Sequence, residues 1–441
     1  MDLLITGGVV LPMDAARSSY LGDVLVRDGR VFAVGPDLVA QASRPHQRLD
    51  ARGHAVLPSF TQTHLHLAHT LFGGLCDQVP GHTWQRERVW RMDAALTPEM
   101  VRAAARLGMA SLLLSGTTTV LDFGTLRHVE ALFEAGREMG LRLTSGKVML
   151  GAPLGRGAGK GESPRAALSE AERLRRKWHG AAGGRLRYAY APHDALSCPE
   201  ELLVELIGRA RGGSCLMQCR AAETSQEVEE VRARFGADTI SHLHEIGLTG
   251  VDVVLAHCVW LTAREQKLLK ESKTRVSHCP VSNLRLGAGV AKAPELVGQG
   301  VQVSLGMDSA ATTGTLDLFE AMRATALIHR TRVGVKSLSP LEVLEMATIR
   351  GADAVGLGQE IGSLEAGKRA DLIIVDLQGV HARSAPDAES ALVFACRGAD
   401  VRHVLIDGRF VVRDHELLPL DVAVIGDDAE RAAALLRRKV S

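Results

Sequence analysis

The sequence lacks an excess of charge of either sign. Among its 441 residues, 52 lysines and arginines stand against 51 aspartates and glutamates. Proteins that bind nucleic acid or an anionic membrane surface usually carry a net positive field, so this balance predicts neither partner. The basic cluster Arg173–Lys177 (RLRRK) is better explained as the solvated face of a helix.

Long apolar runs and paired cysteines are also missing. No apolar stretch approaches the ~20 residues that a membrane-spanning helix needs. The N-terminus has no charged segment followed by an apolar one, which a secretory signal would show. The seven cysteines are scattered and form no CxxC pair, so they predict no disulfide framework. With 46% hydrophobic and 23% charged residues, the chain is expected to be a globular cytoplasmic protein.

The glycine patterns of nucleotide-binding proteins are absent as well. No Gly-x-Gly-x-x-Gly follows the first candidate strand of the central region. The segment Gly155–Gly161 (GRGAGKG) lacks the spacing of a phosphate-binding loop and has no serine or threonine after its lysine. We interpret this segment as an ordinary loop.

Short β runs separated by tight turns occupy both ends of the chain. Asp28-Gly29 lies between two such runs near the N-terminus, and Asp407-Gly408 lies between two more near the C-terminus. An Asp-Gly pair in this position predicts a β-hairpin. Because the two ends share this pattern, we predict that residues 1–56 and 358–441 form one small β-sandwich domain, which ends in a charged helix.

Between these ends, residues 57–357 alternate short β runs with helical stretches. Thr262 with Glu265 and Ser339 with Glu342 have the spacing of capping boxes at helix starts. The candidate strands end near His66, Asp122, Leu150, Ala191, Cys219, His257, Cys279 and Asp308. Eight β-then-α units predict an α/β fold with a (β/α)8 TIM barrel, whose active site lies at the C-terminal ends of the strands. An open doubly wound sheet is the alternative.

Two histidines stand at the end of the first candidate barrel strand, in Leu57–Thr70 (LPSFTQTHLHLAHT). Side chains two residues apart on a strand point to the same side, so His64 and His66 share a face. Two converging imidazoles can hold one metal ion. A lone His-x-His pair often arises by chance, so this interpretation depends on further ligands at later strand ends.

Three more polar residues follow candidate strands. A carboxylate at Glu223 can act as a general base, and the structural alternative is a glutamate at a helix N-terminus. His257 closes an apolar run, where a buried hydrogen-bonded histidine is the alternative. Asp308 follows a buried strand, and such a carboxylate needs a metal, an arginine or a backbone N–H as partner. Their shared position at strand ends, together with the two histidines, predicts one common site.

These residues stand in longer motifs, namely LPSFTQTHLHLAHTLFGGL, LLLSGTTTVLDF, LAHCVWLTAREQKLL, HCPVSNLRLGAGVAKAPELVGQGVQVSLGMD and EMATIRGADAVGLGQEIGSLEAGKRADLIIVDL. On these motifs, nearly the whole chain resembles the amidohydrolase superfamily, in the branch that contains triazine chlorohydrolases and methylthioadenosine/S-adenosylhomocysteine deaminases. The resemblance implies a metal-bearing (β/α)8 barrel with a β-sandwich built from both termini. This agrees with the architecture predicted from the chain itself.

The resemblance also implies roles for the strand-end residues. His64 and His66 match the first two metal ligands of the family and Asp308 matches the last. They imply one divalent metal ion, with zinc expected and iron as the alternative. Glu223 matches the glutamate that shuttles a proton, and His257 matches the histidine that orients the metal-bound water. Glu223, His257 and Asp308 are therefore the expected catalytic residues.

Three further positions match the substrate pocket of the family. Trp84 matches a pocket aromatic residue, and His193 matches a histidine that contacts substrate in the nucleoside deaminases. Asp93 stands where those deaminases have a glutamate that binds ribose hydroxyls. The resemblance thus implies a small heterocyclic molecule as the partner. The sequence leaves open whether the protein is a homo-oligomer.

Arg220 departs from the family pattern. The third metal ligand of the family is a histidine three residues before the glutamate, and Arg220 stands at that place. A guanidinium has no lone pair for a metal and stays protonated. Its side chain can swing into the site and pair with Asp308 or Glu223, or it can turn outward, which we expect in metal-rich conditions. The loop Ser309–Gly314 also differs from the family's Gly-Ala, small residue, Asn-Asn pattern.

Three functions are compatible with these observations. The first is a metal-dependent aminohydrolase that deaminates an amino-substituted heterocycle such as a purine nucleoside. The second is a hydrolase of the same mechanism that acts on an s-triazine or another C–N or C–Cl substrate. The third is a non-catalytic barrel that binds a small molecule because Arg220 has displaced the metal. The joint presence of the five strand-end residues favours a hydrolase over the binding barrel.

Overall fold

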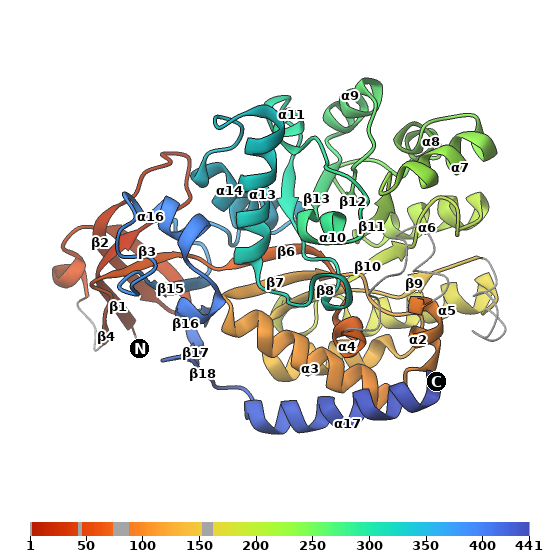
Figure 1. Ribbon diagram of the computed structural model, residues 1–441. Helices are drawn as coiled ribbons and strands as arrows, with labels where there is room; N and C mark the ends of the chain where they lie inside the picture. Colours follow the sequence, from red (N-terminus) through yellow and green to blue (C-terminus); the bar gives the residue numbers. More distant parts are fainter. Residues whose placement is uncertain (1, 43–45, 74–87, 152–161, 441) are drawn as a thin grey trace. The chain divides into compact units, whose positions relative to one another are not determined.

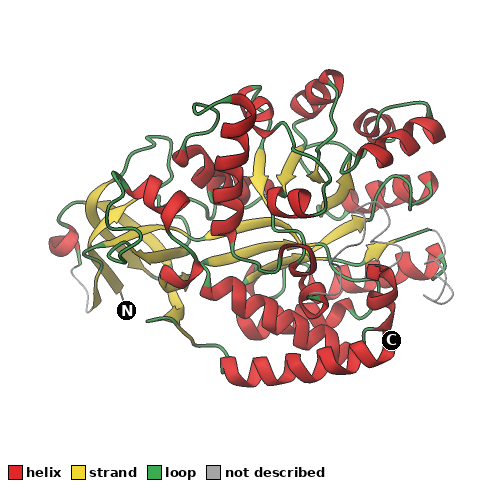
Figure 2. Cartoon of the chain, in the orientation of Figure 1, coloured by secondary structure: helices red, strands yellow, loops and turns green. Residues whose placement is uncertain are grey.

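The computed structural model describes residues 2–42, 46–73, 88–151 and 162–440 (Figure 1). The chain is an α/β protein that contains two large sheets and many helices, as the colouring by secondary structure shows (Figure 2). It divides into two compact units. The first comprises residues 1–62, 110–119 and 317–421, and the second comprises residues 63–109, 120–316 and 422–441. The domain boundaries drawn from the sequence stay a prediction.

One sheet is built from both ends of the chain. Its strands are β1 (Asp2–Val10), β2 (Tyr20–Arg27), β3 (Arg30–Gly35), β4 (His46–Asp50), β5 (His54–Pro58), β15 (Leu372–Asp376), β16 (Val401–Ile406), β17 (Arg409–Arg413) and β18 (Glu416–Leu417). They follow the order β18-β17-β16-β15-β5-β1-β2-β3, with β4 beside β1. The antiparallel pair β5 and β15 joins the N-terminal strands to the C-terminal ones. The predicted joint β domain is confirmed in this sheet.

Both predicted hairpins are present in this sheet. Asp28 and Gly29 connect β2 to β3 with φ of 50° and 78°, and Asp407 and Gly408 connect β16 to β17 with φ of 48° and 69°. Positive φ at both central residues is the geometry of a type I′ turn, which suits the twist of the strands it joins. The apolar sides of these strands form a common core that includes Val24, Val56, Leu372, Ile374 and Leu405.

The other sheet is the (β/α)8 barrel. Its strands are β6 (Phe60–Leu65), β7 (Thr117–Asp122), β8 (Arg142–Ser145), β9 (Val148–Met149), β10 (Leu186–Pro192), β11 (Leu216–Ala221), β12 (Val253–His257), β13 (Arg275–His278) and β14 (Val303–Leu305). The order is β14-β13-β12-β11-β10-β8-β7-β6, with β9 beside β10. A parallel bridge between Leu65 and Asp308 brings the first and last strands together. The TIM barrel is therefore confirmed, and the open doubly wound sheet is wrong.

Within the described residues, α-helices follow the barrel strands. They are α2 (Trp90–Ala95), α3 (Pro98–Leu114), α4 (Val129–Met139), α5 (Pro164–Trp178), α6 (Glu200–Gly212), α7 (Ser225–Phe235), α8 (Thr239–Glu245), α9 (Ala263–Ser272), α10 (Pro280–Arg285), α11 (Ala293–Gly298), α12 (Ala310–Thr313), α13 (Leu318–Val333), α14 (Pro340–Ala347), α15 (Ile349–Ala354), α16 (Ala388–Ser390) and α17 (Val422–Val440). The capping boxes at Thr262 and Ser339 are formed as predicted, at the starts of α9 and α14. Reciprocal caps of this kind satisfy amide groups that the first helical turn leaves unpaired.

The third barrel strand differs from the sequence prediction, because it is split into β8 and β9. Two glycines explain the break. Gly124 has φ of +88°, and a Cβ placed there would lie 1.7 Å from the carbonyl oxygen of Gly146. A Cβ at Gly146 would in turn lie 1.8 Å from the carbonyl oxygen of Ala189. Three backbone segments thus pack at a separation that only glycine permits, next to the strand ends that form the site.

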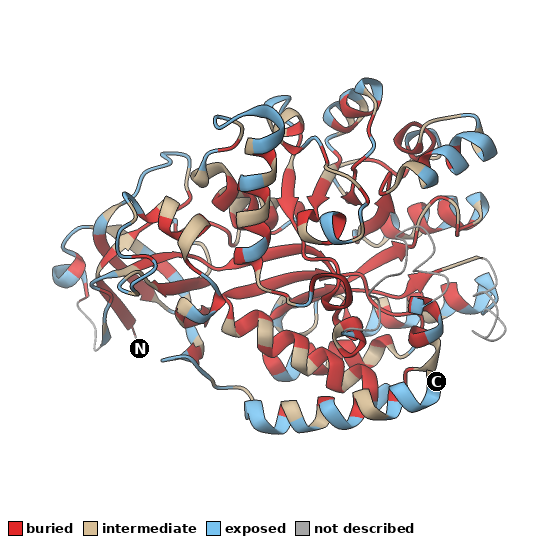
Figure 3. Ribbon diagram, in the orientation of Figure 1, coloured by how far each residue is buried: buried red, intermediate tan, exposed pale blue. Residues whose placement is uncertain are grey.

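Burial follows the expected pattern of a barrel. The barrel strands are buried along their length, whereas α17 is exposed along one side (Figure 3). Strands that are covered on both faces read as continuous apolar runs, as in the stretch before His257. Among the helices of the described residues, none is both long and apolar enough to cross a lipid bilayer.

Candidate metal centre and substrate pocket

Three predicted metal ligands meet where the barrel closes. His64 and His66 belong to the end of β6, and Asp308 follows β14. The backbone N–H of His66 donates to the carbonyl of Asp308 at 2.7 Å, and the N–H of Asp308 donates to the carbonyl of His64 at 3.0 Å. The ligand atoms of these three residues lie within 4.8 Å of one another. The alternation of side chains along β6 therefore places both imidazoles beside the carboxylate, as predicted.

The spacing of these atoms fits one divalent metal ion. Nε2 of His64 and Nε2 of His66 each lie 3.5 Å from Oδ1 of Asp308. Two ligand atoms bound tetrahedrally to one zinc ion lie about 3.4 Å apart. Neither of these nitrogens has a hydrogen-bond partner among the described residues, although both are buried. Buried polar atoms are normally satisfied, and an imidazole nitrogen left in this way is a ligand that a metal would use.

The charge states of the three ligands also suit a cation. Burial lowers the pKa of His64 to about 4 and puts the pKa of His66 well below its ordinary value. Both rings are therefore neutral at pH 7, which is the form that binds metals. Burial alone would raise the pKa of Asp308, but the Arg220 guanidinium holds it well below its ordinary value. Ser282 Oγ donates to Asp308 Oδ2 at 2.5 Å and fixes the carboxylate plane.

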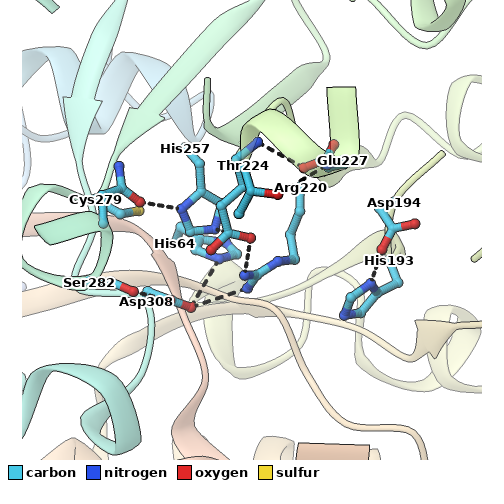
Figure 4. A network of polar contacts seen from close by, with 12 residues as sticks. His64, His193, Asp194, Arg220, Thr224, Glu227, His257, Cys279, Ser282 and Asp308 are labelled. Carbon is cyan, nitrogen blue, oxygen red and sulfur yellow. Dashed lines mark hydrogen bonds and ion pairs between the residues drawn. The ribbon is translucent and has the colours of Figure 1, made fainter. Parts of the chain in front are cut away.

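Arg220 lies inside this site rather than outside it (Figure 4). It is the fifth residue of β11 and only 4% exposed. Its Nη1 lies 3.3 Å from Asp308 Oδ1, and its Nη2 donates to Glu223 Oε2 at 2.6 Å. Of the two arrangements considered from the sequence, this is the inward one. The outward arrangement expected in metal-rich conditions is not the one described.

The remaining two predicted catalytic residues border the same centre. Nδ1 of His257 lies 2.9 Å from Oδ1 of Asn283, so the amide oxygen accepts a hydrogen bond from the ring N–H and directs Nε2 inward. That Nε2 lies 3.9 Å from Glu223 Oε2. Glu223 precedes α7, whose N-cap is Thr224, so the alternative of a simple helix-terminal glutamate does not describe it. Burial raises the pKa of Glu223, but the charge of Arg220 outweighs that effect and the net pKa is lowered.

A pocket opens beside the three ligands. Within the described residues it is lined by His66, His69, Val89, Trp90, Asp93, Phe123, Gly124, Leu126, Val148, His193, Arg220, Asp308 and Ser309. The predicted pocket residues Asp93 and His193 are thus present. Trp84 lies outside the described residues, and its place in the pocket stays a prediction. An apolar pocket with a few converging polar groups is the usual form of a small-molecule site.

Asp93 is the buried acid of this pocket. Its Oδ2 accepts a hydrogen bond from the backbone N–H of Leu126 at 3.3 Å, and its Oδ1 has no partner among the described residues. Burial raises the pKa of Asp93 to about 7. A buried carboxyl oxygen without a partner is unfavourable, so a hydroxyl-bearing ligand would find an acceptor here.

His193 forms a dyad with its neighbour Asp194. Nδ1 of His193 lies 2.5 Å from Asp194 Oδ2, and Asp194 Oδ1 accepts the backbone N–H groups of Leu196 and Ser197 at 2.9 and 2.7 Å. The ring of Trp90 meets the ring of His193 edge to face, with centroids 5.8 Å apart. The aspartate therefore fixes the tautomer and the plane of a histidine that faces the pocket.

Sequence reasoning missed several residues of this centre. They are His69, Trp90, Asp194, Ser282 and Asn283. The ring of His69 stacks on His66 at 4.4 Å and 5°, and its place three residues after the His-x-His pair is a signal that could have found it. Asp194 directly follows His193 and could have been found in the same way. Ser282 and Asn283 stand in the quoted motif after Cys279, but nothing in that motif shows which side chain they contact.

Comparison with known proteins identifies the family. The model of the amidohydrolase family matches residues 55–411. The chain belongs to the amidohydrolase family. The 5'-deoxyadenosine deaminase of Methanosarcina mazei is 35% identical over 444 residues, which cover 100% of this chain and 99% of that protein. The 5-methylthioadenosine/S-adenosylhomocysteine deaminase of Syntrophobacter fumaroxidans is 37% identical over 429 residues, with 96% and 95% covered.

A solved structure agrees with these relatives. The crystal structure of an adenosine deaminase from Xanthomonas campestris with bound zinc superposes with a TM-score of 0.93 at 27% identity, and the match covers 99% of both chains. The expectation of an amidohydrolase-type hydrolase with a TIM barrel is therefore confirmed at the level of the family. In this amidohydrolase the donor set of His64, His66 and Asp308 fits one divalent metal ion.

Proposed function

We propose that this amidohydrolase hydrolyses the exocyclic C–N bond of an adenosine-like nucleoside and releases ammonia. The observation that carries the proposal is the convergence of neutral His64 and His66, ionised Asp308, Glu223 and an oriented His257 on one centre, of which His66 and Asp308 also line a pocket. Full-length relatives named as 5'-deoxyadenosine and methylthioadenosine/S-adenosylhomocysteine deaminases support the substrate class.

His64, His66 and Asp308 would hold one divalent metal, for which we propose zinc. Two imidazoles and a carboxylate are a known three-residue ligand set of catalytic zinc. When bound, such an ion supplies hydroxide at neutral pH, because it lowers the pKa of a coordinated water towards 7. Asp308 keeps its second oxygen on Ser282, so the carboxylate is held in position whichever cation its first oxygen meets.

Glu223 and His257 handle the protons in this proposal. His257 presents Nε2 to the centre, because its Nδ1–H donates to Asn283 Oδ1, and a lone pair on Nε2 can accept a hydrogen bond from the attacking water. Glu223 takes a proton from that water and delivers it to the ring nitrogen next to the reacting carbon. The remaining hydroxyl proton of the added water then passes through Glu223 to the leaving amine, which departs as ammonia and leaves an oxo-heterocycle. Glu223 must loosen its contact with Arg220 to carry this proton.

The pocket residues would select a nucleoside. The unpartnered Oδ1 of Asp93 can accept from a ribose hydroxyl, and the His193–Asp194 dyad can hydrogen-bond the edge of the ring system. Trp90 and Phe123 supply flat apolar surfaces around His193, which suit an aromatic base. The names of the relatives favour nucleosides altered at the 5' position.

The test measures ammonia release by zinc-loaded protein from adenosine, 5'-deoxyadenosine, methylthioadenosine, S-adenosylhomocysteine and guanine, and chloride release from a chlorinated s-triazine. We expect turnover of the adenosine derivatives and at least a ~100-fold loss of kcat in Glu223→Gln, because general acid–base catalysis contributes about 10²–10⁴-fold. The exposed Glu271→Gln serves as a control. Release from the s-triazine alone would transfer the proposal to that substrate class. No turnover of any compound, with tight nucleoside binding, would favour a binding barrel.

A further inference from the structure

The position of Arg220 has a direct consequence for the metal centre. Its guanidinium reaches Oδ1 of Asp308 at 3.3 Å. The same oxygen lies 3.5 Å from the ligand nitrogens of His64 and His66. The carboxylate oxygen that a metal would use is therefore already paired with a cation of the chain. A guanidinium keeps its charge at any pH that the fold tolerates.

Arg220 also holds the other acid of the centre. Its Nη2 donates to Glu223 Oε2 at 2.6 Å, so one side chain pairs with both carboxylates. Arg220 and Asp308 are almost fully buried, and Glu223 is 9% exposed. Charge-assisted hydrogen bonds of this kind are stronger than neutral ones and are screened little by salt when buried. Each of the two carboxylates thus has a cationic partner without any bound ion, and the three side chains together keep one net negative charge.

We propose that Arg220 is a resident cation that competes with the divalent metal for Asp308 and Glu223. The inference rests on the proposed function, in which His64, His66 and Asp308 hold the metal. A divalent ion between these ligands meets a positive charge on the same oxygen, so it binds only as the guanidinium withdraws. The chain therefore binds its metal weakly and exchangeably, and both carboxylates keep a cationic partner when the metal is gone.

Two features of the structure support exchange rather than permanent exclusion. Asp308 keeps Ser282 as a partner of Oδ2, so loss of the arginine contact does not leave the carboxylate bare. The arginine lines the pocket, so its long side chain borders a space into which it can move.

The experiment compares zinc binding in the full-length protein and in three variants at one position. Arg220→Gln removes the charge, Arg220→Lys keeps it, and Arg220→His adds a ligand. The matched control is Arg175→Gln, because Arg175 also pairs with a glutamate three residues away, at 2.7 Å, on α5 and outside the centre. Each protein is stripped of metal and dialysed identically. Zinc is then counted by elemental analysis, and its affinity is measured by competition with a chromophoric chelator.

We expect zinc affinity to rise about 10–100-fold in Arg220→Gln, a range typical of single residues next to a metal, and further in Arg220→His. Arg220→Lys and Arg175→Gln should have the same zinc affinity as the wild type. Equal affinities in wild type and Arg220→Gln would overturn the proposal, and so would an Arg220→Lys variant as tight as Arg220→Gln. If Arg220→Gln folds poorly, Arg220→Leu replaces it, because leucine also removes the charge and adds no zinc ligand, and it should bind zinc more tightly than wild type and Arg220→Lys.

These outcomes separate the inference from the proposed function. Tighter zinc binding in Arg220→Gln and Arg220→His without ammonia release from any nucleoside would remove the proposed function and leave the competition established. If the wild type releases ammonia and binds zinc as tightly as Arg220→Gln does, the proposed function stands and the competition is overturned.

Discussion

At the scale of single residues, the backbone aims the side chains of the metal centre. Asp308 and His257 have φ of 63° and 73°, in the left-handed region that most residues avoid. Aspartate and histidine tolerate this region better than most residues, although the left-handed conformation still costs about 1–2 kcal/mol per residue. Strain of this kind persists only where the surrounding structure fixes it. The two hydrogen bonds between Asp308 and the end of β6 do so for that residue.

Asp194 is predicted to position His193 for substrate. In Asp194→Asn, the charged partner of Nδ1 is lost and the ring is free to change tautomer. We expect kcat/KM to fall about 10–100-fold, comparable to the loss of other partners that orient a functional histidine, with the pH profile displaced and zinc content unchanged. Asp252→Asn, which breaks an exposed ion pair with Arg211, should leave both kcat/KM and the pH profile unchanged. An unaltered pH profile in Asp194→Asn would contradict the positioning role.

Asp93 is predicted to make the fold less stable as pH rises. Its pKa is raised from 3.8 to about 7 by burial, so the folded state binds a proton that the unfolded state releases. The unfolding free energy should therefore fall between pH 4 and 7 and level off above 7, by at most about 4 kcal/mol at 1.36 kcal/mol per pKa unit. Urea unfolding of wild type and Asp93→Asn across this range isolates the effect. Parallel curves for the two proteins would refute it.

The placement of a side chain could be predicted from the sequence where one strand or one neighbouring residue determines it. His64 and His66 were predictable because alternation on β6 puts them on one face, and Asp308 was predictable because it follows a buried strand. Asn283 and Ser282 were not, because their partners lie 26 residues away in sequence and the path of the chain between them is not encoded locally. The rotamer of Arg220 depends on a carboxylate 88 residues away, so the sequence left both arrangements open.

At the scale of elements, the close approach at Gly124 should be indispensable. In Gly124→Ala the new Cβ would meet the Gly146 carbonyl oxygen at 1.7 Å, and the residue would also have to keep φ at +88°. We expect a loss of unfolding free energy of about 3 kcal/mol or more, from overpacking and backbone strain together. Chemical denaturation gives the measurement. Gly180→Ala is the matched control, since Gly180 has φ of +84° and nothing within 4 Å of its Cβ position, and it should lose only about 1–2 kcal/mol.

Element boundaries could be predicted where side chains signal them and not where contacts made elsewhere impose them. The capping boxes at Thr262 and Ser339 mark helix starts that the structure confirms. The interruption between β8 and β9 has no comparable local signal, because the reason for it is the backbone of Gly124 and Ala189 on neighbouring segments. The run before Leu150 therefore resembled one continuous strand.

At the scale of the whole molecule, a fragment of residues 57–357 is predicted to aggregate. It would retain α13, whose Arg323 donates to the carbonyls of Phe394 and Cys396 at 3.1 and 2.6 Å. Those partners and the sheet strands of the same compact unit would be missing, so apolar and polar surface would be uncovered together. Light scattering and thermal unfolding of the fragment and of the full chain provide the comparison. A monodisperse fragment with one cooperative transition would show that the β domain is dispensable.

The hydrogen bonds between the end of β6 and Asp308 also predict how zinc affects the rate of amide hydrogen exchange. The amides of His66 and Asp308 donate across the seam of the barrel, and the side chains of the same segments are the proposed metal ligands. An ion bound by His64, His66 and Asp308 would link the first barrel strand to the segment after the last one and would stabilise the closed barrel. Hydrogen exchange at these two amides should then slow when zinc is added, by the factor that zinc contributes to the closed state. Zinc binding and the slowed opening of the barrel between β6 and Asp308 should therefore follow the same zinc concentration dependence, measured by zinc titration and by hydrogen exchange.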